Sequence, residues 1–283
     1  MGTREADLAG TWYPDTAEAC DRMISELRGD EPLPTVEPGL RGGIVPHAGW
    51  VFSGRVALRV LETLALSAPE TETVLLFAGH LAPTSPVSVM VEGEVWTPYG
   101  PIATDEELAH ALLQRCHARA ETGETHTQDN SAEVQFPLLK RLWPAARIVV
   151  VGAPPRVDSL ELAQVAAELA LDRGRRILAV GSTDLTHYGP NYGFTPRGRG
   201  AAALSWVRDE NDPRFLAQAE RLDPQAMIVE ALSRRNACCP GAAAAAVHCA
   251  HRLGSTRATL LAYATSADVR PDDSFVGYGG VVF

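Results

Sequence analysis

Short apolar runs bounded by glycine, proline or charged residues recur along the chain. Such runs predict buried strands, because the central strands of an α/β sheet are covered on both faces. The predicted strands are 44–45, 73–78, 87–91, 147–151, 176–180 and 257–262, with a glycine-kinked final strand in 275–283. These runs are short and dispersed, so we expect the core to be one sheet assembled from distant parts of the chain.

Helical periodicity fills most of the intervals between these runs. In 53–64, for example, Val56, Val60, Leu61 and Leu64 lie on one face of a helix. The other predicted helices are 16–27, 105–117 with Thr104 as N-cap, 132–142 despite Pro137, 160–171 and the alanine-rich 241–253. Alternating strands and helices imply an α/β fold with a mostly parallel central sheet and helices on both faces. With no internal repeat and no low-complexity linker, residues 1–283 are expected to form a single domain.

Composition narrows the classes of partner. The apolar content of 46% is enough for a full core, and the formal net charge of −10 without a lysine or arginine cluster argues against nucleic-acid binding. The N-terminus has no apolar signal region, and no run approaches the 18 apolar residues of a membrane span. Five cysteines, an odd number, favour a reduced, cytoplasmic protein with no membrane partner.

Residues with metal-ligand chemistry follow several predicted strands. His47 comes just after the strand at 44–45, His80 after 73–78, and Asp184 and His187 after 176–180. In an open α/β sheet, ligands bind beyond the carboxyl ends of the strands, so these side chains can converge. They predict a metal site or an acid/base site. Each histidine could instead hydrogen-bond its own loop, and Asp184 could cap a helix.

A vicinal pair, Cys238-Cys239, precedes Pro240-Gly241 and the alanine-rich helix. A thiolate at a helix N-terminus has a lowered pKa and makes a good metal ligand or nucleophile. The alternative is a pair of small buried residues packed under the sheet. A disulfide between adjacent cysteines would be strained, and the chain has no C-x-x-C zinc-ribbon or thioredoxin pattern.

Taken in order, several segments of the chain resemble the Memo family, which includes the AmmeMemoRadiSam system protein B group. The matching segments are Gly10-Thr11-Trp12-Tyr13-Pro14, Pro46-His47-Ala48-Gly49-Trp50, Gly79-His80, Ser131-Ala132-Glu133-Val134-Gln135, Ser182-Thr183-Asp184, His187-Tyr188-Gly189 and Cys238. The resemblance spans nearly the whole chain. It implies a fold like that of class III extradiol dioxygenases, which use non-haem Fe(II).

The resemblance also implies roles for individual residues. His47, His80 and Cys238 would be the metal ligands. Asp184 and His187 would line the same cleft, with Trp12 as a wall. From the residues themselves, Asp184 could orient His187 as a general acid/base, or one of the two could bind metal.

The chain departs from the family pattern in three places. Ala78-Gly79 precedes His80 where the family has Pro-Ser, and Asn130 replaces a pocket histidine. Cys238-Cys239-Pro240-Gly241 replaces Cys-Gly-Arg-x-Pro, which leaves the choice between the two thiols open. These changes suggest a reshaped substrate pocket that includes Trp12 and Asn130.

The expected function is an Fe(II)-dependent oxidoreductase that activates O2 on a small, phenolic or catechol-like substrate. Two histidines and one anionic ligand with open positions suit non-haem iron. A zinc hydrolase with His187 as proton shuttle is the second hypothesis. A non-catalytic protein that holds iron or copper, or that binds a peptide in the cleft, is the third. The sequence leaves the oligomeric state open.

Overall fold

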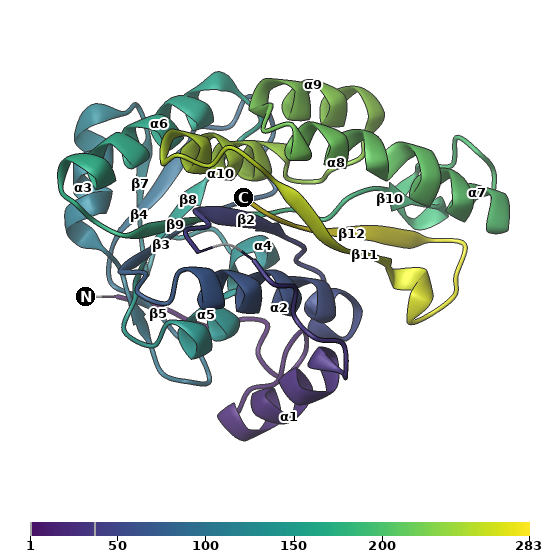
Figure 1. The fold of residues 1–283 in the computed structure, drawn as a ribbon, viewed down its shortest axis with the longest axis horizontal. Coiled ribbons are helices and arrows are strands. Elements are labelled where there is room, and N and C mark those ends of the chain that lie inside the picture. The colour runs from purple at the N-terminus through teal and green to yellow at the C-terminus, as the bar shows by residue number, and fades with distance from the viewer. Residues whose placement is uncertain (1, 37) are drawn as a thin grey trace.

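The computed structural model describes residues 2–36 and 38–283, and over these residues the fold is built around a nine-stranded sheet (Figure 1). The strands are β2 (Gly42–Val45), β3 (Thr73–Ala78), β4 (Ser88–Glu92), β7 (Arg119–Thr122), β8 (Arg147–Gly152), β9 (Ile177–Ser182), β10 (His187–Tyr188), β11 (Thr259–Thr265) and β12 (Phe275–Val282). Their order is β10-β12-β2-β9-β3-β8-β4-β7, and β11 pairs with β12. The seven strands predicted from apolar runs are all members of this sheet.

The centre of the sheet is parallel and its flanks are mixed. Strands β2, β9, β3 and β8 run parallel to one another, as expected from the strand–helix alternation. Strand β12 is antiparallel to both β2 and β11, and β4 is antiparallel to β8. Strands β11 and β12 are consecutive and joined without a long helix, so they pair as a hairpin. The α/β expectation is confirmed, and the architecture is consistent with an extradiol dioxygenase-like fold.

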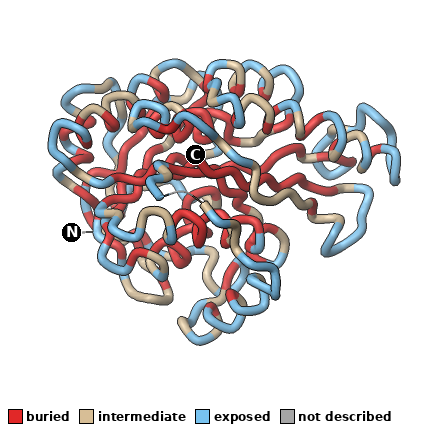
Figure 2. The backbone as a smooth tube through the Cα atoms, in the orientation of Figure 1, coloured by how far each residue is buried: buried red, intermediate tan, exposed pale blue. Residues whose placement is uncertain are grey.

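Helices cover both faces of the sheet (Figure 1). One face packs against α3 (Glu106–Arg115), α6 (Val157–Asp172), α8 (Asp212–Glu220), α9 (Pro224–Arg234) and α10 (Pro240–Arg252). The other packs against α1 (Ala17–Arg28), α2 (Trp50–Ser67) and α5 (Phe136–Leu142). Burial is concentrated along the central strands between these layers (Figure 2). Because both faces are covered, the polar ends of the strands are the natural place for a binding site.

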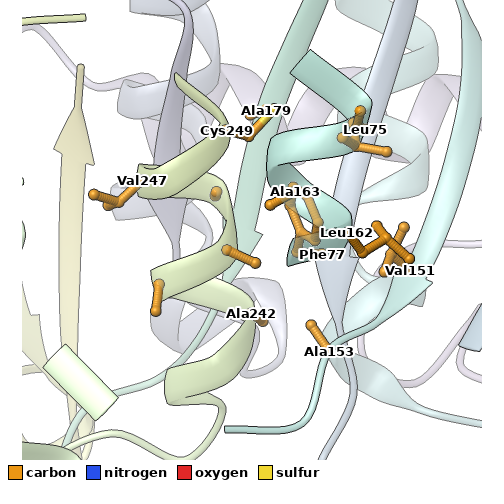
Figure 3. Close-up of a cluster of buried hydrophobic side chains, with 14 of the residues drawn as sticks. Leu75, Phe77, Val151, Ala153, Leu162, Ala163, Ala179, Ala242, Val247 and Cys249 are labelled. Carbon is orange, nitrogen blue, oxygen red and sulfur yellow. The ribbon is translucent and has the colours of Figure 1, made fainter. Parts of the chain in front are cut away.

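Helix α10 packs unusually close to the sheet. Its run of alanines lies over β9, and a Cβ atom added at Gly181 would meet the Ala242 carbonyl oxygen at 2.8 Å and the Ala243 Cα at 2.8 Å. Figure 3 shows Ala242, Val247 and Cys249 of α10 among the buried side chains of this layer. The close approach brings the first residues of α10 to the carboxyl end of β9, just before the predicted site residue Asp184.

Two helix predictions need correction. The predicted helix 132–142 is divided into α4 (Asn130–Glu133) and α5, and Pro137 lies in the first turn of α5, where its missing N–H removes no helical hydrogen bond. The N-cap of α3 is Asp105 and not Thr104, because the Asp105 carboxylate accepts the backbone N–H of Leu108.

Several short elements were not predicted. Strands β1 (Thr3–Arg4), β5 (Glu94–Val95) and β6 (Ile102–Ala103) form a separate three-stranded sheet. Between β10 and β11 the chain forms a 3-10 turn at Pro190–Tyr192, α7 (Ala201–Trp206), a π-helical segment at Val207–Asn211, α8 and α9. Among the described residues, no helix is both long enough and apolar enough to span a membrane.

Candidate metal centre

His47 lies in the loop between β2 and α2 and is almost completely buried. Its backbone N–H donates to Asp184 Oδ1 at 2.7 Å, and its Nδ1 lies 3.0 Å from Ser182 Oγ. The Asn130 side chain donates to the His47 carbonyl at 3.0 Å. These contacts fix both the loop and the ring, and they leave Nε2 free to face the other ligand-type residues.

His80 follows β3 through Gly79, whose φ of +104° is a conformation that favours glycine. The Asp129 carboxylate accepts the His80 backbone N–H at 2.9 Å and lies 3.2 Å from the ring Nδ1. Asp129 is itself held as the N-cap of α4 by the backbone N–H of Ser131. A carboxylate on one ring nitrogen orients the other toward a metal, as in carboxylate–histidine–zinc arrangements.

Two backbone hydrogen bonds place the cysteine pair beside these histidines. The Cys238 N–H donates to the Asp184 carbonyl at 3.1 Å, and the Cys239 N–H donates to Thr183 Oγ1 at 3.0 Å. Cys238 Sγ lies 3.2 Å from His47 Nε2, and His47 Nε2 lies 3.2 Å from His80 Nε2. The structure therefore brings together the three ligands implied by the resemblance, although they are separated by up to 191 residues in sequence.

The donor set fits a metal of intermediate softness. The ligand atoms of His47, His80, Cys238 and Cys239 all lie within 4.8 Å of one another. Imidazole and thiolate ligands suit zinc, copper and iron, and they do not suit magnesium or calcium, which require oxygen ligands. His47 and Cys239 are buried, whereas His80 reaches the surface with 39% of its side chain exposed. One side of the centre therefore remains accessible.

The charges in the centre are strongly coupled. Burial acts against ionisation of Cys238, but the Cys239 thiol and the His47 and His80 rings together hold the pKa of Cys238 well below its usual value. Burial lowers the pKa of both histidines, yet Cys238 and Asp184 raise that of His47 overall, while Asp129 and Cys238 raise that of His80 to about 10. These interactions favour a thiolate at Cys238 when no metal is bound, and a metal cation would displace the protons held by the neighbouring rings.

Asp184 and His187 lie next to this cluster. Asp184 Oδ2 is 4.0 Å from His47 Nε2 and 3.8 Å from His187 Nε2, so the carboxylate lies between the two rings. His187 Nε2 is buried and makes no hydrogen bond. The His187 ring packs against Tyr192 with centroids 4.9 Å apart. Its position leaves a ring nitrogen unused by the fold and close to a carboxylate.

A cavity of about 700 Å³ opens onto the cluster. Its lining includes His47, His80, Asp184, His187 and Asn130, together with the aromatic residues Trp12, Phe52, Tyr192 and Tyr278. Trp12 lies at the edge with 38% of its surface exposed, and Asn130 holds the His47 loop. All the predicted site residues except Cys238 line this cavity. Cys238 lies next to it, with its Sγ 3.2 Å from Nε2 of the lining residue His47.

The sequence-based analysis did not identify Asp129 or Ser182 as part of the site. Both contact the Nδ1 atom of His47 or His80, and neither was given a role, although Ser182 stands in the matching segment Ser182-Thr183-Asp184. A signal was present for Asp129, because it stands three residues before the predicted helix 132–142 and is of a favoured N-cap type. Its second role on His80 depends on the approach of the 123–130 loop to the end of β3.

Comparison with known proteins identifies the family of this chain. The profile of the Memo family, described as Memo-like protein, matches residues 4–282. A MEMO1 family protein of Methanosarcina acetivorans is 35% identical, with 100% of this chain and 99% of the relative covered. A second one, from Pyrococcus furiosus, is 30% identical over 99% of this chain and 98% of its own length. A solved structure of an uncharacterized Escherichia coli K12 protein shares the fold, with a TM-score of 0.52, 12% identity, and coverage of 87% of this chain and 100% of that one. The chain belongs to the Memo family.

Proposed function

We propose that this protein is a metal-dependent oxidoreductase that uses Fe(II) and O2 on a small phenolic or catechol-like substrate. One observation carries the proposal: His47 Nε2, His80 Nε2 and Cys238 Sγ converge beside a cavity that also contains an unpartnered histidine nitrogen. Two neutral ligands and one anion, with positions left open, are the arrangement that non-haem iron oxygenases use. Here a thiolate takes the place of the usual carboxylate.

Iron bound at this centre would supply the redox chemistry, and the chain supplies its orientation. Ser182 and Asp129 hold the Nδ1 atoms of His47 and His80, so both Nε2 atoms face the same point. Hydrogen-bond partners of this kind typically change metal affinity or activity by about 10–100-fold when removed. The ligand rings are therefore oriented before the metal binds.

His187 is proposed as the group that takes or returns the substrate proton. Its Nε2 has no hydrogen bond and lies 3.8 Å from Asp184 Oδ2, so the carboxylate would stabilise the ring once it is protonated. Asp184 has a further positioning role, because it accepts the backbone N–H of His47. Groups of this type contribute about 10²–10⁴-fold to a rate.

The cavity favours an aromatic substrate. Trp12, Phe52 and Tyr192 supply ring surfaces, and aromatic pairs contribute about 0.5–1.5 kcal/mol beyond the area they bury. The Nδ2 group of Asn130 is occupied by the His47 carbonyl, which leaves its side-chain oxygen as an acceptor for a substrate hydroxyl. A phenolic or aminophenolic compound matches both features.

The test is anaerobic loading with Fe(II), addition of catechols and aminophenols, and admission of oxygen. Substrate-dependent oxygen uptake that disappears in His80→Ala would support the proposal. Uptake that persists in His80→Ala would show that free iron is responsible. No uptake across a broad set of phenols, together with tight zinc or Cu(I) binding, would contradict it and favour a hydrolase or a non-catalytic metal- or peptide-binding protein.

A zinc hydrolase is the second candidate. A mixed cysteine and histidine donor set occurs at catalytic zinc, and His187 is placed to shuttle a proton. Metal analysis after anaerobic purification separates the two candidates. Zinc in the purified protein, with activity that does not require oxygen, would favour the hydrolase.

A further inference from the structure

We propose that Cys239 is a fourth ligand that closes the centre around zinc, while iron is held by His47, His80 and Cys238 alone. This inference rests on the proposed metal centre and concerns how that centre selects its metal. It makes the identity of the bound metal the switch between an open, reactive centre and a closed, inert one.

The distance between the two sulfur atoms fits a zinc ion bound by both. Cys238 Sγ and Cys239 Sγ lie 3.8 Å apart. With zinc–sulfur bonds of about 2.3 Å and zinc–nitrogen bonds of about 2.0–2.1 Å, the edges of a tetrahedron are about 3.8 Å between sulfurs and about 3.3 Å between nitrogens. The observed separation of 3.2 Å between the histidine Nε2 atoms also matches. These two edges are therefore close to those of a zinc tetrahedron. The Cys238 Sγ to His47 Nε2 distance of 3.2 Å is shorter than the edge of about 3.6 Å expected between sulfur and nitrogen, and the four donors lie within 4.8 Å of one another, so side chains would adjust when zinc binds.

The fold holds Cys239 beside Cys238. Its backbone N–H is fixed by Thr183 Oγ1, and Pro240 begins α10 directly after it. Its side chain is only 2% exposed, and its sulfur contacts Cys238 Sγ. Ligation forms one metal–sulfur bond, and the thiol proton leaves to solvent.

Zinc and iron prefer different coordination. Zinc is almost always four-coordinate and tetrahedral in sites with four protein ligands, and such sites are closed. Non-haem iron works with three protein ligands and open positions. With Cys239 bound, zinc would have no position left for water or substrate, so the zinc form would be inactive. A zinc hydrolase would require Cys239 to stay unbound.

The experiment uses the full-length protein with Co(II) as a spectroscopic substitute for zinc. We expect a tetrahedral Co(II) spectrum whose sulfur-to-metal charge-transfer band has the intensity of two thiolates, and zinc X-ray absorption that counts two sulfurs. Cys239→Ala should reduce the band to one thiolate and weaken zinc binding by about 10–100-fold or more, whereas Fe(II) affinity should stay within a few-fold. Cys249→Ala is the matched control, because Cys249 is a buried thiol of the same helix that lies outside the centre.

The outcomes separate this inference from the proposed function. An unchanged Co(II) band and unchanged zinc affinity in Cys239→Ala would overturn the fourth ligand and leave the three-ligand centre standing. An equal loss of zinc and Fe(II) affinity would overturn the selectivity, because Cys239 would then serve both metals. Failure of the unaltered protein to give any thiolate charge-transfer band would overturn the metal centre itself, and with it both proposals.

Discussion

Asp129 shows how one carboxylate serves both the fold and the centre. It caps α4, and it also accepts the backbone N–H and contacts the ring Nδ1 of His80. The ion pair with His80 holds the pKa of Asp129 well below its usual value, despite the opposing effect of burial. The charge of Asp129 therefore orients a ligand that is itself only partly buried.

Replacing Asp129 with asparagine should weaken metal binding without unfolding the protein. Loss of the charge leaves His80 less basic and less firmly oriented, so affinity should fall by about 10–100-fold. Competition with a chromophoric chelator measures this change. Asp172→Asn, at the exposed end of α6, is the control for loss of one negative charge. Equal affinities in the two variants would mean that Asp129 acts only as a helix cap.

His187→Ala should separate proton transfer from metal binding. The ring packs against Tyr192 beside Asp184 and is not one of the four convergent donors, so the variant should keep its metal content and its melting temperature. Turnover should fall by about 10²–10⁴-fold. Metal analysis alongside kinetics is the measurement, and His126→Ala in the outer loop serves as control. Loss of metal from His187→Ala would instead make His187 a ligand.

The contact between α10 and β9 is the element-level feature on which the centre depends. Gly181 lets the helix backbone approach so closely that Cys238 reaches His47. Overpacking at such a contact typically costs about 1–3 kcal/mol. Gly181→Ala should therefore lower the free energy of unfolding by about that amount and also weaken metal binding, as followed by thermal melting and metal titration. Gly49→Ala is a suitable control, because an added Cβ there meets its first atom at 3.4 Å.

Asp212, a buried residue at the start of α8, holds the segment between β9 and β10 through hydrogen bonds. Asp212 Oδ1 accepts the Thr186 backbone N–H at 3.0 Å, and Oδ2 accepts the Tyr263 hydroxyl at 2.7 Å. Burial raises the pKa of Asp212 to about 6, although these hydrogen bonds oppose the rise. This carboxyl therefore keeps its proton in the folded protein at pH values where an unfolded chain has lost it.

The free energy of unfolding should consequently fall as pH rises from about 4 through about 6. The folded state binds the extra proton, so the contribution is fully present below about pH 4 and is lost as pH rises through about 6. A pKa that is about 2 higher in the folded protein than in the unfolded chain corresponds to about 3 kcal/mol in the free energy of unfolding. Denaturant unfolding at pH 4.5 and 7.5 should show a smaller difference in Asp212→Asn than in the unaltered protein. Identical pH dependence in both would show that Asp212 is ionised throughout.

Across the entire chain, the proposed metal would connect segments that are far apart in sequence. A ligand that binds only the folded state stabilises it by about 2.7 kcal/mol at 100 times its dissociation constant. Addition of zinc or, anaerobically, Fe(II) should therefore raise the melting temperature. The increase should be absent in His47→Ala and in Cys238→Ser, which each lack one of the convergent donors. An undiminished increase in both variants would place the binding site elsewhere.

The order and type of most elements were readable from the sequence, because apolar periodicity reports burial directly. Strand β3 was predicted with the bounds it has, and β8 and β9 differ from prediction by no more than two residues at either end. The region 190–234 was not predicted, because its helices are short and include a π-helical segment. Pairing direction at the sheet edges was also missed, since a run of apolar residues carries no information about its neighbour.

For the site, the residue types and their positions after strands were sufficient to nominate His47, His80, Asp184 and His187. The Cys238-Cys239 pair was nominated from its position before a helix, and the choice of Cys238 came from the family resemblance. Local sequence determines that each follows a strand or precedes a helix, because turn and cap preferences act over a few residues. Whether Cys238 meets His47, whether Asp129 reaches His80 and how far apart the two thiols lie all depend on packing between distant elements. Those contacts follow from the close approach of α10 to β9 at Gly181 and from the folding of the 123–130 loop over the end of β3. The alanine-rich stretch 241–253 allows close packing on the sheet, but it does not specify which residues meet, because distances between residues 191 positions apart are set by the assembled core.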